Sequence, residues 1–335
     1  MLIVGAGIIG LSCAWRLSGC GIEVTVFDAG TAGGEASWAG AGMLAPGGEM
    51  EEESPLLRMA MRSLQMYPRF VEALREASGA AIDYQRCGAI ELAFDDAEAD
   101  DLERRAARQA HSGIRSEPAA YPRAAAARFY PDDALVNPRD LSAALRIACC
   151  RSNIPVHEHE PVVEIYSDGS GLRTSKAEYR DDGVLIAAGA WSSDLLPDLP
   201  RTFPVRGHLI AFDAAPGMLH TILRRGSTYL LQRDSGSLIA GSSTEHAGFD
   251  RTIDAGIVQD IHQRASRLLP DLSLLQPTEC WNGLRPAIEG EVPFIAKLPD
   301  VPIWAAFGHY RNGILLAPDT SQRIEELVLA TNEHK

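Results

Sequence analysis

Three glycines near the start of the chain have the spacing that binds the phosphates of a dinucleotide. Gly5, Gly7 and Gly10 form a Gly-X-Gly-X-X-Gly motif that follows the short apolar strand expected over residues 1–4 and opens a helix. Gly5 permits a tight turn, Gly7 lets the backbone approach a pyrophosphate, and Gly10 allows close contact between helix and strand. The positive end of the helix dipole would then meet the phosphate charge.

An acidic residue ends the next apolar strand, which is expected over residues 22–27. Asp28 lies 18 residues after Gly10, where a carboxylate can accept a hydrogen bond from an adenosine ribose hydroxyl. The same carboxylate would repel a 2′-phosphate, so the pattern disfavours NADP. The motif alone does not separate FAD from NAD, and a plain tight turn is the alternative interpretation.

Two later segments favour FAD. Residues 184–188 form an apolar strand that runs directly into Gly189. A second glycine-containing loop begins at Gly308 and leads into the last expected helix at Gly313. A helix that starts here would present backbone N–H groups to the electron-rich edge of a flavin.

Two arginines on separate loops are candidates for binding an anionic substrate. The formal net charge of the chain is -14, which disfavours nucleic acid or an anionic membrane as the main partner. Against this acidic background, a guanidinium can still form a bidentate pair with a carboxylate and remains charged when partly buried. We expect Arg311 to make the bidentate contact and Arg285 to act as a second cation. A structural or surface ion pair is the alternative for each.

Three longer runs carry a resemblance to a known family. They are residues 36–44 (ASWAGAGML), residues 281–286 (WNGLRP) and residues 308–318 (GHYRNGILLAP). With the dinucleotide motif in front of them, the chain resembles the D-amino-acid oxidase superfamily of FAD-dependent oxidoreductases. Within that superfamily it is most similar to the glycine oxidases of thiamine biosynthesis, and the similarity covers nearly the whole chain.

The resemblance implies which residues would bind the cofactor, and the dinucleotide motif adds its glycines. The predicted FAD-binding residues are Gly5, Gly7, Ile8, Ile9, Gly10, Asp28, Ala29, Ala36, Ser37, Ala41, Gly42, Met43, Val162, Gly189, His309, Tyr310, Arg311, Asn312, Gly313, Ile314 and Leu315. His309 is expected to act through its backbone rather than as a base. Residues 287–298 lack the flavin-linking cysteine of the related sarcosine oxidases, so FAD is expected to be non-covalent.

The resemblance also implies a substrate site. The predicted catalytic and substrate-binding residues are Tyr229, Arg285 and Arg311, with Met43 and Thr244 also lining the substrate pocket. Tyr229 would hydrogen-bond the substrate carboxylate and close the pocket, although an ordinary core tyrosine is the alternative. Thr244 stands where the glycine oxidase pattern has a methionine, which makes the pocket more polar and leaves the substrate size open.

The implied activity is FAD-dependent oxidative deamination of glycine or a similar small amine. A hydride would pass from Cα to flavin N5, dioxygen would reoxidise the flavin and yield hydrogen peroxide, and the imine would give glyoxylate and ammonia or enter thiazole synthesis. The first alternative is an oxidase or dehydrogenase of sarcosine, a D-amino acid or an N-substituted glycine. A flavin-binding protein without redox activity and an NAD-dependent dehydrogenase are weaker alternatives.

The expected fold is α/β, or α+β overall, with two discontinuous domains like those of D-amino-acid oxidase. An FAD-binding domain with a parallel sheet would comprise residues 1–80, 135–200 and 290–335. A substrate domain with a large mixed or antiparallel sheet would comprise residues 81–134 and 201–289. A chain of 335 residues is long enough for two such units.

The cysteines and the apolar stretches of the sequence indicate whether the protein binds metal or a membrane. The six cysteines form no Cys-X-X-Cys pair and no cluster with zinc spacing, so we expect reduced thiols and no metal. No stretch of about 18 apolar residues is present, so we expect a cytoplasmic protein with no membrane partner. The oligomeric state is left open, and a homo-oligomer is compatible with the family. The acidic run at residues 49–53 is predicted to be a solvated loop, with a mobile cover over the site as the alternative.

Overall fold

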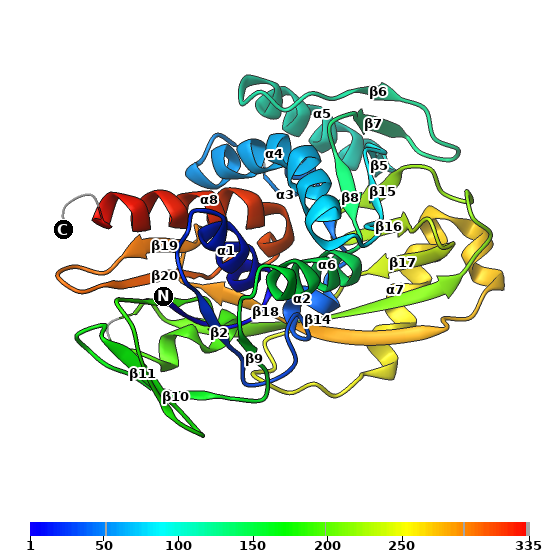
Figure 1. Cartoon of the computed structure of the whole chain (residues 1–335). Helices are drawn as coiled ribbons and strands as arrows, with labels where there is room; N and C mark the ends of the chain where they lie inside the picture. Colours follow the sequence, from blue (N-terminus) through cyan, green and yellow to red (C-terminus); the bar gives the residue numbers. More distant parts are fainter. Residues whose placement is uncertain (51, 198, 291, 333–335) are drawn as a thin grey trace.

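The first of two large sheets contains the dinucleotide motif. The computed structural model describes residues 1–50, 52–197, 199–290 and 292–332, and within them this sheet has six strands in the order β19-β20-β13-β1-β2-β9 (Figure 1). All neighbouring pairs are parallel except β19 with β20. The bounds are β1 Leu2–Val4, β2 Thr25–Phe27, β9 Val156–His157, β13 Val184–Ile186, β19 Phe294–Lys297 and β20 Ile303–Phe307.

Helices cover one face of this sheet and a small antiparallel sheet covers the other. Figure 1 shows α1, α4, α6 and α8 together on one side, and β10 and β11 on the opposite side. The strands alternate accordingly, because Ile3 joins the helix-facing core while Leu2 and Val4 join the core beneath the small sheet. The bounds are α1 Ile8–Gly19, α4 Pro55–Ser78, α6 Pro138–Arg151, α8 Gly313–Asn332, β10 Val162–Ile165, β11 Gly171–Thr174 and β12 Glu178–Arg180.

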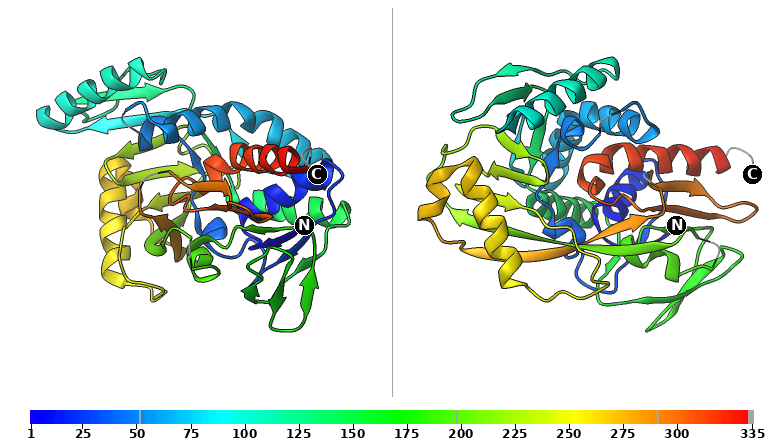
Figure 2. Two further views of the ribbon diagram at one scale, coloured as in Figure 1. Left: turned by 90° about the vertical axis from the view of Figure 1, so that its left-hand side faces the viewer. Right: turned by 180° about the vertical axis from the view of Figure 1, so that it is seen from behind.

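The second large sheet has eight strands in the order β18-β14-β17-β16-β15-β5-β7-β6 within the same residues. It is antiparallel except where β15 and β5 run parallel. Its outer face packs on α7, which Figure 2 shows in yellow beside the strands, while Leu209 and Leu231 on the inner face join the core of the first sheet. The bounds are β5 Ala89–Ala93, β6 Glu117–Ala119, β7 Ala126–Tyr130, β14 Thr202–Asp213, β15 Ile222–Arg225, β16 Thr228–Gln232, β17 Ser237–Gly241, β18 Glu279–Ile288, α5 Asp96–His111 and α7 Ala255–Leu268.

Short elements connect the two sheets. A three-stranded sheet of order β3-β8-β4 lies between them, and it pairs Met43 with Leu135. β4 and β5 follow each other in the chain but belong to different sheets, because each pairs with a strand from residues 126–136. The bounds are α2 Ala36–Ala39, β3 Met43–Leu44, α3 Pro46–Glu49, β4 Tyr84–Gln85, β8 Ala134–Val136, η1 Gly189–Asp194 and η2 Pro270–Leu274.

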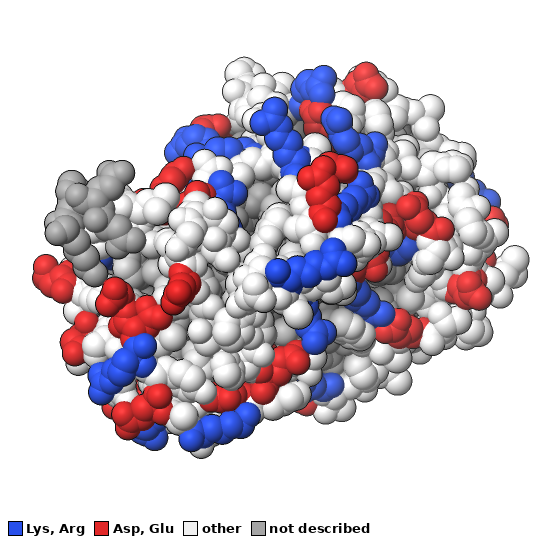
Figure 3. All heavy atoms as spheres, in the orientation of Figure 1, with Lys and Arg blue, Asp and Glu red and all other residues white. Residues whose placement is uncertain are grey.

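The predicted α/β architecture with a parallel and a large mixed sheet is confirmed. Every strand of the first sheet comes from a segment assigned to the FAD-binding domain, and every strand of the second comes from a segment assigned to the substrate domain. The division into domains at these boundaries stays a prediction. Figure 3 shows acidic and basic side chains interspersed over one face of the molecule.

Candidate active site

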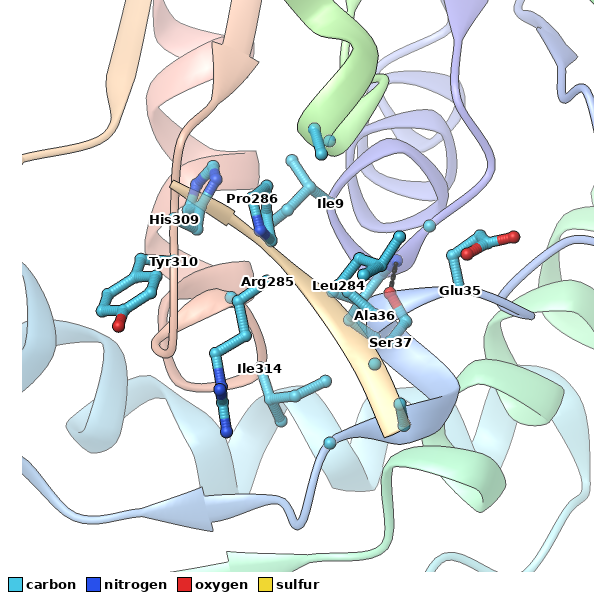
Figure 4. A pocket seen from close by; sticks show the side chains of 18 of the residues that line it. Ile9, Glu35, Ala36, Ser37, Leu284, Arg285, Pro286, His309, Tyr310 and Ile314 are labelled. Carbon is cyan, nitrogen blue, oxygen red and sulfur yellow. Dashed lines mark hydrogen bonds between the residues drawn. The ribbon is translucent and has the colours of Figure 1, made fainter. Parts of the chain in front are cut away.

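A long cavity of about 720 Å³ lies between the carboxyl ends of the first sheet and the inner face of the second. Its size is in the range of about 300–1,000 Å³ that is typical of ligand sites. The lining begins at the β1–α1 turn and at Asp28, continues along residues 35–43, and ends at β16, β18 and the loop before α8 (Figure 4). Segments far apart in the sequence therefore meet around one elongated space.

Asp28 marks one end of the cavity and is held by two backbone groups. Its Oδ2 accepts the Ala6 N–H at 2.6 Å, and its Oδ1 accepts the Gly30 N–H at 2.8 Å. Each carboxylate oxygen can accept a further hydrogen bond. The carboxylate is thus fixed at the end of β2, where a ribose hydroxyl of a dinucleotide could reach it.

The N-terminus of α1 opens onto the middle of the cavity. Gly7 caps this helix without a side-chain hydrogen bond, and its first turn contains no acidic residue. Ile8 donates its N–H to Ser37 Oγ at 2.9 Å, which ties the turn to α2 (Figure 4). Because the first backbone N–H groups lack a side-chain cap and no carboxylate lies in the first turn, this helix start can bind a phosphate group. The carboxylate, the helix start and the cavity length together fit a dinucleotide cofactor.

The loop before α8 lies at the other end and is fastened to β18. Tyr310 donates its N–H to Pro286 O at 2.9 Å, and Asn312 donates its N–H to His309 O at 2.9 Å. His309 is buried, with its Nε2 3.0 Å from Thr320 Oγ1. Burial lowers the pKa of His309 to about 3, so the ring is neutral and is a poor candidate for a general base.

Arg285 projects from β18 into the same end of the cavity, near Tyr310 and Ile314 (Figure 4). Its Nη1 donates to Ser243 O at 3.1 Å and to Arg206 O at 3.4 Å, and its Nη2 donates to Ser242 Oγ at 3.0 Å. These acceptors are all neutral. Within the described residues, no carboxylate compensates the charge of this guanidinium, so it can bind an anion.

The comparisons with known proteins identify the family. The sequence matches the family described as FAD dependent oxidoreductase over residues 1–327. The chain belongs to this family. The predicted resemblance, the FAD cofactor and the classification as an FAD-dependent enzyme are therefore confirmed.

Several relatives of this FAD-dependent oxidoreductase have names that specify an activity. Glycine oxidase from Geobacillus kaustophilus is 33% identical over 97% of this chain and 92% of its own length. The bifunctional protein ThiO/ThiG of a Synechocystis species is 32% identical over 98% of this chain, which spans 51% of that protein. The crystal structure of glycine oxidase from Geobacillus kaustophilus superposes on this chain with a TM-score of 0.94. The match covers 98% of this chain and 94% of that enzyme's chain. The crystal structure of iminodiacetate oxidase from a Chelativorans species matches with a TM-score of 0.87 and 25% sequence identity. That match covers 98% of this chain and 95% of the other.

Most of the predicted cofactor residues of the oxidoreductase line the cavity. Three of the predicted site residues do not. Gly10 packs against the first turn, where an added Cβ would lie 1.9 Å from Gly5 O, and Leu315 is buried inside α8. Thr244 is exposed, and Ser242 lines the cavity instead.

Tyr229 and Arg311 both line the cavity but differ in their surroundings. Tyr229 is partly buried on β16 and faces the inner side of the second sheet. Arg311 is exposed, and its guanidinium carbon lies 5.7 Å from the centre of the Tyr310 ring. The expected roles of both residues remain predictions.

Arg224 lines the cavity and was missed by the sequence analysis. It is buried on β15, where Nε donates to Glu91 at 2.9 Å and Nη1 donates to Asp133 at 2.7 Å. Burial raises the pKa of Asp133 to about 6 against the opposing effect of the arginine. The one available signal was a charged residue directly after the apolar pair Ile222-Leu223 in a short strand.

Two classes of site are not found in the part of the chain that is described. No group of three or more His, Cys, Asp or Glu side chains is placed to hold a metal ion. No helix there is long and apolar enough to cross a membrane. The acidic run at residues 49–53 includes Glu51, which lies outside the described residues, whereas Glu53 pairs with Arg58 at 2.5 Å.

Proposed function

We propose that this oxidoreductase catalyses the oxidative deamination of glycine or a similarly small amino acid. The observation that carries the proposal is the guanidinium of Arg285, which lies in the cavity wall and donates only to neutral acceptors among the described residues. An uncompensated guanidinium in a partly buried wall favours a substrate carboxylate. The names of the relatives support glycine as that substrate.

Arg285 rather than Arg311 is proposed as the bidentate carboxylate partner. Nη1 and Nη2 of Arg285 donate hydrogen bonds to the protein, and no described acceptor is hydrogen-bonded to Nε. The edge formed by Nε and Nη2 therefore retains two donors for the two oxygens of a carboxylate. Arg311 is exposed and is assigned the role of a second, outer cation.

The side chains of this chain bind and orient the substrate. When bound, FAD would supply the redox chemistry, which is the removal of a hydride from the substrate Cα and the reduction of dioxygen to hydrogen peroxide. Arg285 fixes the carboxylate, and the Tyr229 hydroxyl closes the pocket beside it. Their contribution is orientation and exclusion of water rather than proton transfer.

The charges around the cavity favour a neutral substrate amine. The described carboxylates in the lining are Asp28, Glu35 and Asp194, and Figure 4 shows Glu35 well away from Arg285. The other charged side chains of the described lining are the arginines at positions 224, 285 and 311. An ammonium ion there would lack an acidic partner, so the amine binds without its extra proton.

The imine product hydrolyses to glyoxylate and ammonia or enters thiazole synthesis. Similarity to one half of a bifunctional protein ThiO/ThiG supports a role in thiamine biosynthesis. The six cysteines are all free thiols, which supports a reducing cytoplasmic setting.

Product analysis tests the proposal. The purified yellow protein is mixed with glycine, sarcosine, D-alanine or iminodiacetate, and oxygen uptake, hydrogen peroxide and the oxo acid are measured. Glycine should give equal amounts of peroxide and glyoxylate at a rate at least comparable to the other amines. No peroxide with glycine, but rapid turnover of a bulkier amine, would contradict glycine as the substrate. Flavin reduction without oxygen uptake would instead identify a dehydrogenase.

A further inference from the structure

A β-bulge lies directly behind Arg285. Leu209 on β14 pairs with Gly241 on β17, whereas the next bridge joins Arg206 to Glu245. Two residues of β14 therefore face three residues of the other segment, which has one extra residue. We call residues 242–245 the bulged segment. Bulges redirect side chains, and this one turns two oxygen atoms toward a single arginine.

The bulged segment supplies the acceptors that hold the Arg285 guanidinium. Ser242 Oγ accepts from Nη2 at 3.0 Å, and Ser243 O accepts from Nη1 at 3.1 Å. The arginine reaches them by crossing β14 at Gly207, where an added Cβ would lie 2.1 Å from Nη1. The position of the guanidinium thus depends on where the bulged segment places Ser242 and Ser243.

The Glu245 carboxylate fixes the bulged segment to β14. Its Oε1 accepts from Ser243 Oγ at 2.6 Å and from His208 Nδ1 at 2.8 Å. Its Oε2 accepts from Arg206 Nε at 2.8 Å and Nη2 at 2.7 Å. Burial opposes ionisation, but the hydrogen bonds from Ser243, His208 and Arg206 keep the pKa of Glu245 below its ordinary value.

The two ring nitrogens of His208 have different partners. Its Nε2 accepts the Asp254 N–H at 3.2 Å, so the ring proton resides on Nδ1 and is donated to Glu245. On the other side of the segment, Arg264 from α7 donates to Ser242 O at 3.3 Å. Neither His208, Ser243 nor Glu245 lines the cavity.

We propose that Glu245, with Ser243 and His208, is a positioning unit that sets the affinity of Arg285 for the substrate carboxylate. Glu245 acts through the bulged segment and does not contact the substrate. The proposal rests on the proposed function only in taking a carboxylate as the ligand of Arg285. Loosening the segment should let the guanidinium leave the position in which Ser242 and Ser243 hold it.

The test compares two variants that remove a charged partner from the same arginine. Glu245→Gln keeps the side-chain size but weakens the contacts to Ser243, His208 and Arg206. Asp250→Asn is the matched control, because Asp250 pairs with Arg206 Nη1 at 2.7 Å, whereas its described hydrogen bonds and ion pairs do not include the bulged segment. Acetate, a carboxylate without an amine, is titrated into each FAD-loaded protein, and its Kd is read from the change in flavin absorbance. The KM and kcat for glycine are measured in parallel.

The proposal predicts that Glu245→Gln raises the acetate Kd and the glycine KM roughly tenfold, with kcat and FAD content little changed. Asp250→Asn should leave both constants near those of the wild type. An unchanged acetate Kd in Glu245→Gln, or an equal loss of acetate affinity in both variants, would overturn the proposal. If Glu245→Gln does not fold, Ser243→Ala replaces it with the same expectations. Acetate binding requires no turnover, so failure of glycine as a substrate is distinguished from failure of the positioning unit.

Discussion

Tyr229 and Gly241 face each other across β16 and β17, and the tyrosine hydroxyl occupies the space that a side chain at position 241 would fill. The two residues are register partners, and an added Cβ at Gly241 would lie 2.4 Å from Tyr229 Oη. The pair borders the bulged segment, whose first residue contacts Arg285. Because glycine has no side chain, position 241 leaves room for the tyrosine hydroxyl beside the proposed carboxylate site.

Gly241→Ala should displace the Tyr229 hydroxyl without affecting the cofactor. Because the added methyl group cannot share the space of the hydroxyl, we expect kcat/KM for glycine to fall by roughly tenfold to a hundredfold. FAD content should be retained. Gly19→Ala is the control, since an added Cβ there meets no atom within 4 Å. Equal kcat/KM in Gly241→Ala and the wild type would show that this hydroxyl position is unimportant.

Arg285→Lys should weaken substrate binding much more than Arg311→Lys. A lysine retains the charge but cannot offer two parallel donors, so we expect the KM for glycine to rise by roughly a hundredfold at position 285. The exposed Arg311 should give a change of a few fold. Steady-state kinetics and acetate titration measure both effects. The opposite order would restore Arg311 as the bidentate partner.

Asp28→Ala should lower both FAD affinity and the stability of the apoprotein. The change leaves the Ala6 and Gly30 N–H groups without their acceptor, at a cost of about 1–3 kcal/mol of unfolding free energy. Loss of the ribose contact should raise the FAD Kd at least tenfold. Asp194→Ala removes another carboxylate from the cavity lining and is the control variant. It should have a smaller effect on FAD affinity and on the free energy of unfolding. Tight FAD binding by Asp28→Ala would contradict the assigned role.

His309 should make stability depend on pH without acting in catalysis. Its pKa is lowered to about 3 by burial, so between pH 6.5 and 3 the unfolded chain binds a proton that the folded protein excludes. Stability should therefore fall with decreasing pH by up to about 1.4 kcal/mol per unit in this window. His309→Gln should show a shallower slope in chemical unfolding at pH 7 and pH 5, with the pH profile of kcat/KM unchanged. An altered profile would assign the ring a proton-transfer role.

Local signals in the sequence predicted the elements that hold the cofactor. The strand expected before Gly5 and the helix expected after the glycine motif are both present, as β1 and α1. The glycine motif and Asp28 were likewise found because their contacts lie within one β-α-β unit. Such features depend on spacing within a few tens of residues, which the sequence displays directly.

The substrate end depends on contacts that spacing does not reveal. Arg224 is held by Glu91 and Asp133, which are 133 and 91 residues away in the chain. Thr244 was assigned to the pocket from the family pattern, but the bulge interrupts the alternation of the strand and leaves it exposed while Ser242 lines the cavity. One extra residue in a pairing register therefore changed which side chain reaches the site.

Anaerobic titration of the FAD-loaded protein with glycine tests the central claim most directly. The absorbance of the oxidised flavin is followed as glycine is added without oxygen, with Arg285→Lys titrated alongside at the same FAD content. The account predicts loss of the flavin absorbance with saturating glycine in the wild type, and a much higher concentration for half-reduction in the variant. A flavin that stays oxidised with glycine, or a variant reduced at the same concentrations as the wild type, would contradict it.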